Sequence, residues 1–127
     1  MSIQALLQKL QAIKGPDRAI ELEIAEILGW RKKVEPFTDP KTGANKERTL
    51  WLVPTSNDTA NVPFYTSNLF DAYRLAQEVA PGHIGACSWE PGAGGAKIGR
   101  SPVCQAATPM IALCMAALSE LERTRGQ

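Results

Sequence analysis

The most apolar stretch of the chain covers residues 107–122, and its pattern predicts a helix that is buried on more than one side. Thr108 is a favourable N-cap, and Pro109 suits the first helical position because its missing N–H needs no partner there. Apolar residues recur at three- and four-residue steps and also fill most of the intervening positions. The run is well short of the roughly 20 residues that cross a bilayer, so it indicates a core helix.

Two amphipathic helices are expected before residue 29. Ser2 can cap the first helix, and the Gly15-Pro16 pair ends it, since glycine often follows a helix and proline cannot continue one. Asp17 can cap the second helix, which Gly29 closes. Their apolar faces are predicted to be Ile3, Leu6, Leu7, Leu10 and Ile13 in the first, and Ile20, Ile24, Ile27 and Leu28 in the second.

The middle of the chain alternates β-like and helical patterns. Residues 30–35 and 49–53 are typical of strands, and the polar residues 36–48 between them predict a long hairpin loop. Residues 83–90 and 97–104 predict two more strands, separated by a glycine-rich turn at 91–96. A helix is expected between the two hairpins, with Ser67 as its cap and an apolar face of Leu69, Ala72, Tyr73, Ala76 and Val79.

The predicted order is helix, helix, strand, strand, helix, strand, strand, helix, in one α+β domain of residues 1–127. Two hairpins favour an antiparallel sheet of about four strands. Four helices are enough to cover both faces of that sheet, or one face thickly. A chain of 127 residues can bury well over half of its unfolded surface without a metal or a disulfide.

The charge balance argues against a nucleic-acid binder. Lys and Arg number 14 against 13 Asp and Glu, which leaves a net charge of +1, and the basic run Arg31-Lys32-Lys33 fits a solvated strand edge. No secretory signal or membrane anchor is visible, and three cysteines are an odd number for paired disulfides. We therefore expect reduced thiols and a location in the cytoplasm, away from the membrane.

The residues that could carry catalysis or hold a metal are few. His83 is the only histidine, and on a strand Cys87 would lie about 13 Å away at roughly 3.3 Å per residue, too far for a hydrogen bond. A zinc site from His83, Cys87, Cys104 and Cys114 would lack the closely spaced cysteine pairs of such sites. No catalytic residue, cofactor or metal is predicted.

Three further groups of residues have a functional and a structural interpretation. Residues 91–100 fit neither GxxxxGK[ST] nor GxGxxG, so a hairpin turn is favoured, with Lys97 and Arg100 contacting an anion as the alternative. Glu21, Glu23 and Glu26 fit a solvated helix face. Trp30, Trp51 and Trp89 all fall in predicted strands, where they could form core or line one aromatic sheet face that stacks a flat ligand.

Several segments together resemble the phage ABA sandwich domain family, small proteins of bacteriophages and prophages. They are GPDR at 15–18, IAEILGW at 24–30, PFYTS at 63–67, DA at 71–72 and ATPMIALCMAAL at 107–118. The resemblance spans nearly the whole chain, in the order of the family's motifs. It implies a sheet between helix layers, an α/β/α sandwich, and a phage origin, and it implies no activity and no catalytic residue.

The leading hypothesis is a non-enzymatic phage or prophage accessory protein that acts in the host cytoplasm by binding a host or phage partner. The alternative is a small-molecule sink that captures a nucleotide signal in an anti-defence role. Its site would be a cleft between the sheet and the start of the third helix. The candidate ligand-binding residues are Trp30, Tyr65, Thr66, Ser67, Trp89 and Arg100. An enzyme is the least favoured class, and a homo-oligomer is left open.

Overall fold

The computed structural model describes residues 2–125, so the ends of the expected domain, Met1 and Gly126-Gln127, lie outside the described residues. Its elements are α1 (Ile3–Ala12), α2 (Arg18–Ile27), β1 (Arg31–Thr38), β2 (Asn45–Leu52), α3 (Leu69–Val79), β3 (Gly85–Glu90), β4 (Ala93–Ile98), β5 (Cys104–Ala106) and α4 (Pro109–Arg125). The α+β class is confirmed. The predicted order holds apart from one additional short strand, β5.

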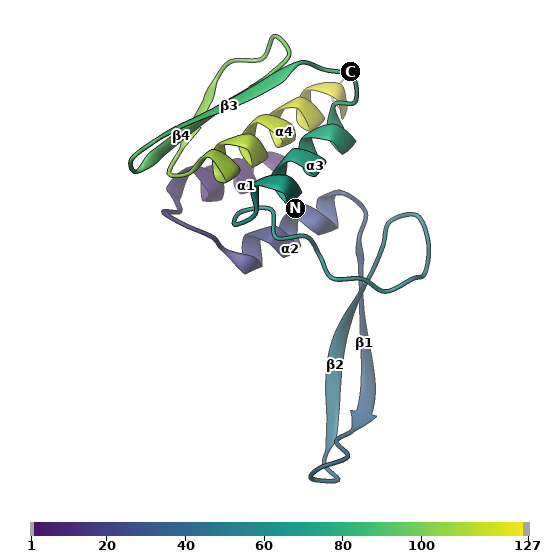
Figure 1. Ribbon diagram of the computed structural model, residues 1–127. Coiled ribbons are helices and arrows are strands. Elements are labelled where there is room, and N and C mark those ends of the chain that lie inside the picture. Colours follow the sequence, from purple (N-terminus) through teal and green to yellow (C-terminus); the bar gives the residue numbers. More distant parts are fainter. Residues whose placement is uncertain (1, 126–127) are drawn as a thin grey trace.

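The strands form two separate antiparallel sheets, which corrects the single sheet of about four strands. One is the two-stranded β1–β2 hairpin, and the other has the order β3–β4–β5. The hairpin carries charged side chains along both strands, so it has no continuous apolar face with which to extend the other sheet. In Figure 1 it projects away from the four helices and the three-stranded sheet, which together are called the body below.

Helix α4 is the centre of the body. Every residue from Ile111 to Leu118 is buried, and the helix packs against α1, α3, β4 and β5. Figure 1 shows it directly beneath the β3–β4 pair. This confirms the prediction that the segment is enclosed on more than one side.

The glycines before α4 belong to a strand, so the turn predicted at 91–96 is wrong. Strand β4 begins at Ala93, and the tight turn before it uses Gly92 at φ 77°. A Cβ atom added to Gly94 would lie 2.2 Å from the Pro109 nitrogen. The glycine therefore lets the start of α4 lie directly against the sheet.

The helices lie on one side of the three-stranded sheet (Figure 1), so the described chain has two layers and not a sandwich of three. Strands β3 and β4 pair from Gly85↔Ile98 to Glu90↔Ala93. Ala96 and Ile98 face the helices and are buried, whereas Lys97 lies on the opposite face and is exposed. One face of the sheet is thus open to solvent.

The hairpin is longer than its pattern predicts. Pairing runs from Arg31↔Leu52 to Thr38↔Asn45, so the predicted loop at 36–48 shrinks to residues 39–44. Two ion pairs join the arms of this extension: Arg48 pairs with Glu35 on the neighbouring strand, and Lys46 Nζ of β2 lies 3.1 Å from Oδ2 of Asp39 at the start of the loop. A polar segment can thus form paired strands even though most of its side chains stay exposed to solvent.

Three of the four predicted N-caps are confirmed. Ser2, Asp17 and Thr108 each accept a hydrogen bond from the N–H three residues later, at 3.1, 3.1 and 3.2 Å. The cap of α3 is Asn68 and not Ser67, because a turn at 65–67 carries the chain one residue further before the helix starts.

Candidate functional site

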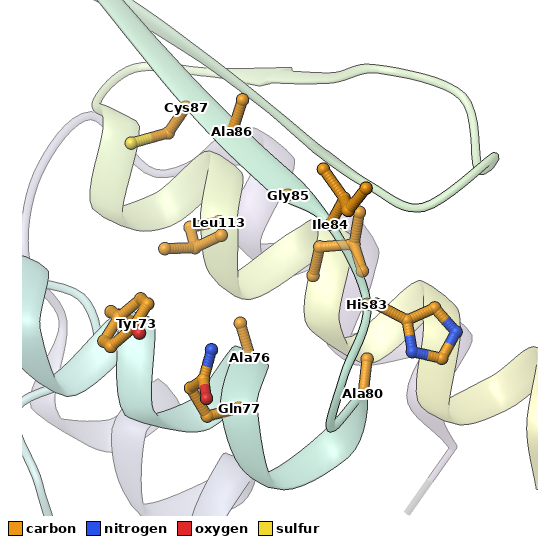
Figure 2. A pocket seen from close by; sticks show the side chains of 11 residues that line it. Tyr73, Ala76, Gln77, Ala80, His83, Ile84, Gly85, Ala86, Cys87 and Leu113 are labelled. Carbon is orange, nitrogen blue, oxygen red and sulfur yellow. The ribbon is translucent and has the colours of Figure 1, made fainter.

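An apolar groove lies between α3 and the outer edge of the three-stranded sheet (Figure 2), with a volume of about 490 Å³. Tyr73, Ala76 and Gln77 of α3 form one wall, the chain at residues 84–87 forms the other, and Leu113 of α4 lies between them. Among residues 2–125, no Asp, Glu, Lys or Arg side chain lines the groove. The remaining lining residues are Ala80, His83, Ile84, Gly85, Ala86, Cys87 and Ile98.

The second wall of the groove is an unpaired strand edge. β3 pairs with β4 on one side and with no described strand on the other, and α3 packs on α4 while barely contacting β3. The Gly99 N–H donates to the Ile84 carbonyl at 2.6 Å, so the main-chain groups of Ile84 point toward β4. Because pairing alternates along an antiparallel ladder, the N–H and C=O groups of Gly85, Cys87 and Trp89 point to the free edge.

Helix α3 exposes large apolar side chains beside the groove. Leu69, Phe70 and Tyr73 are 45%, 64% and 51% exposed, whereas Ala72 and Leu75 are buried against the core. The prediction that Leu69 and Tyr73 belong to the buried face is therefore wrong. Among the described elements the helix packs mainly on α4, so only a narrow stripe is covered. Contiguous exposed apolar side chains of this kind mark interaction surfaces.

A polar pocket of about 780 Å³ adjoins the groove and shares His83 and Ile84 with it. It also contains Arg100, Arg123 and the buried carboxylate of Glu120. Arg123 Nη2 donates to Glu120 Oε2 at 2.7 Å, and this hydrogen bond, with a second from Ser101, holds the pKa of Glu120 below its ordinary value. Arg100 has no ion-pair partner among residues 2–125.

Two of the predicted ligand-binding residues are buried within the fold. Thr66 donates its N–H and its hydroxyl to Glu21 Oε2 at 2.9 and 2.6 Å, and its Oγ1 accepts from the Asp17 N–H at 3.0 Å. Arg18 Nη1 donates to the other Glu21 oxygen at 2.8 Å. Glu21 is thus a buried hydrogen-bond centre that ties α2 to the segment before α3, and its assignment to a solvated face is wrong.

Tyr65 is likewise buried, and burial raises the pKa of its hydroxyl. Its carbonyl accepts a hydrogen bond from Cys114 Sγ at 3.2 Å. Ser67 is exposed, and its N–H donates to the Phe64 carbonyl at 3.2 Å. These groups hold the entry to α3 in place.

The other candidates are dispersed over the molecule. Trp30 and Trp51 are partly buried at the base of the hairpin, whereas Trp89 lies on β3 and is 76% exposed, so the three rings do not line one sheet face. Arg100 lies in the polar pocket. The structure therefore does not bring the six predicted residues together at one site.

The thiols and the imidazole form no reactive pair. Cys87 and His83 lie at opposite ends of the groove (Figure 2), and burial raises the pKa of the thiols of Cys104 and Cys114. Within residues 2–125, no group of three or more His, Cys, Asp and Glu side chains is placed to hold a metal ion.

Sequence reasoning did not identify Tyr73, Gln77 and Ile84 as surface residues of a groove. One signal was present: α3 carries Phe70 and Tyr73 in addition to Ala72 and Leu75, more apolar residues than one buried stripe needs. A second signal was that residues 84–89 contain no charged residue and no proline.

Comparison of the chain with protein-family models, with curated proteins and with solved structures found no significant match. Among the described helices, none combines the length and the hydropathy that a membrane crossing requires.

Proposed function

We propose that this chain is a non-enzymatic bacteriophage or prophage protein that acts in the host cytoplasm by binding a protein partner through the groove surface. The groove surface is defined as Leu69, Phe70 and Tyr73 of α3 together with Ile84 and the free edge of β3. The observation that carries the proposal is that the exposed side chains of Tyr73 and Ile84 line a groove with the unpaired edge of β3, and that the exposed Phe70 ring lies next to Tyr73. Buried aromatic side chains are the commonest anchors of protein interfaces.

The phage origin rests on the sequence resemblance described above. The cytoplasmic location is supported by three free cysteines, of which one is buried and two are partly buried. Thiols remain reduced in that compartment.

The test is capture of partners from lysate of infected host cells with the wild-type chain and two variants. Phe70→Asp removes an exposed ring from the groove surface, and Val34→Asp makes a similar change at a 53% exposed position of the hairpin. Capture of a defined partner is expected with the wild type and with Val34→Asp, and loss of at least tenfold with Phe70→Asp. Equal capture by both variants would show that the groove surface is not the binding site.

The alternative function is capture of a small anionic ligand, such as a nucleotide signal, in the polar pocket. The observation in its favour is the unpaired guanidinium of Arg100 beside Arg123 and His83, in a pocket of a size typical for ligands. Thermal-shift measurements with nucleotides distinguish it, because a ligand bound to the native state raises Tm. A rise that Arg100→Ala abolishes would favour this alternative over the protein partner.

A further inference from the structure

Helix α3 lies below the position of a strand that the described chain does not contain. Helix α4 packs chiefly on β4, and α3 lies beside α4. Packed helices are about 8–10 Å apart and neighbouring strands about 4.8 Å apart, so one helix spacing equals roughly two strand spacings. Counting two strand positions from β4 in the direction of β3 leads to the position just beyond β3, and α3 lies beneath that position. The groove walled by Tyr73 and Gln77 is the space over α3 that such a strand would cover.

The edge of β3 is chemically open to another strand. The pairing with β4 is continuous from Gly85 to Glu90, so no bulge interrupts it, and the strand contains no lysine and no proline. Proteins usually protect exposed edges with those features. Gly85, Cys87 and Trp89 therefore offer three sets of main-chain donors and acceptors at alternate positions.

Charge differs between the two ends of the groove. The start of β3 adjoins the polar pocket, where Arg123 is paired with Glu120 and Arg100 is left without an ion-pair partner among the described residues, whereas the strand ends at the exposed carboxylate of Glu90. Between them, no charged side chain of the described part of the chain lines the groove. A complementary segment is uncharged where it crosses the groove and acidic at the end beside Arg100.

We propose that the groove binds an extended segment of a partner protein as a fourth strand, antiparallel to β3, with acidic residues at the C-terminal end of that segment beside Arg100. The antiparallel direction places the C-terminal end of the segment at the start of β3, and antiparallel pairing is the more stable arrangement. This inference rests on the proposed binding function and names the form of the partner.

A second copy of the chain does not fit the same edge. Pairing β3 with β3 of another copy would bring both α3 helices under the same two strands, closer than the roughly 8–10 Å that packed helices need. A partner that supplies a strand without a helix on that face avoids this overlap. Light scattering of the chain alone is expected to give a monomer, and a dimer that Cys87→Pro dissociates would overturn the inference.

The direct test is NMR titration with the peptide acetyl-Ser-Val-Thr-Ala-Thr-Val-Thr-Asp-Glu-amide. The amide signals of Gly85, Cys87 and Trp89 are expected to shift on addition of the peptide. Two versions N-methylated on alternate residues, in opposite frames, separate main-chain pairing from side-chain contact. Only the frame that faces β3 should lose binding. No shift of these amides at millimolar peptide, or equal binding of both methylated versions, would overturn the proposal.

Variants of the chain give an independent readout. Cys87→Pro removes an N–H that faces the free edge, so it should weaken peptide binding at least tenfold while leaving the β3–β4 ladder intact. If its Tm falls sharply, Ala76→Arg on the opposite wall replaces it, with the same expected loss. Unchanged affinity in either folded variant would contradict strand addition.

The charge assignment is tested by a matched pair of reversals. Arg100→Glu in the polar pocket should weaken the peptide several-fold, and Arg74→Glu on the exposed side of α3 should not. Equal effects would overturn the placement of the acidic end. If the peptide fails while Phe70→Asp still abolishes partner capture, the proposed function survives and this inference does not.

Discussion

The β1–β2 hairpin and the β3 edge are both exposed antiparallel structure, yet their surfaces are opposite in chemistry. The hairpin is covered with charges that pair across the strands, such as Arg48 with Glu35, and the Arg48 guanidinium lies 5.7 Å from the centre of the Phe37 ring. From Gly85 to Trp89 the β3 strand has no charged side chain. The comparison shows that exposure alone does not mark a binding site. A binding site also needs main-chain groups without hydrogen-bond partners, or apolar surface that nothing covers.

The two regions also differ in what stabilises them. The body encloses a continuous apolar core around α4, whereas the hairpin is held by its own ladder and by contacts at its base. There Arg31 donates to the carbonyls of Val53, at 3.1 Å, and Ser56. Removal of apolar volume should therefore affect the two regions very differently.

The largest difference is expected from truncating an apolar side chain in each region. Leu118→Ala in α4 removes a side chain with 0% exposure and should lower the free energy of unfolding by about 3 kcal/mol. Val34→Ala at a 53% exposed hairpin position should change it by less than about 0.5 kcal/mol. Urea denaturation followed by circular dichroism measures both, and similar losses would mean that the hairpin is part of the core.

A smaller effect is expected from removing one hydroxyl in each region. Thr66→Val removes a hydrogen bond to the buried carboxylate of Glu21 and should lower the free energy of unfolding by about 1–3 kcal/mol. The same substitution at exposed Thr49 in β2 should change the free energy of unfolding by less than about 0.5 kcal/mol. If Thr66→Val unfolds at the wild-type urea concentration, the network at Glu21 does not stabilise the chain.

The smallest expected effect is on the loss of stability at low pH. The pKa of Glu120 is held below its ordinary value of 4.5, chiefly by the hydrogen bond from Arg123. Since the folded pKa is the lower one, its stabilisation is present above pH 4.5 and disappears as pH falls through the lowered value. The urea midpoint of Glu120→Gln should therefore fall less than that of the wild type on acidification.

The matched control for that measurement is Asp39 in the hairpin. Its pKa is also lowered, first by the backbone N–H of Lys41 and then by Lys46, but Asp39 is only partly buried and lies at the tip of the hairpin, away from the core. Asp39→Asn should leave the acid dependence of global unfolding close to that of the wild type. If Asp39→Asn altered the acid dependence of unfolding more than Glu120→Gln, the hairpin and not the body would carry the acid-sensitive stability.

The parts of the fold that were predictable are those with strong local signals. The caps at Ser2, Asp17 and Thr108 and the buried run in α4 follow from side-chain chemistry and short-range periodicity. The cap at Ser67 was wrong because a turn at 65–67 shifts the start of α3 by one residue, and its buried face was wrong because the helix packs mainly on α4 along a narrow stripe. The candidate site residues were chosen by residue type without knowledge of their neighbours, and the fold separates them: Thr66 is buried against Glu21, whereas Arg100 lies in the polar pocket.

By itself the sequence determined the α+β class, the near-complete order of elements and the central place of residues 110–118, because those depend on spacing along the chain. Only the tertiary structure decided that the strands divide into two sheets and that α3 leaves Tyr73 exposed over an open groove. Strand pairing and the lateral position of a helix arise from contacts between distant segments. No local period encodes those contacts, so the surface proposed for binding became visible only once the chain was folded.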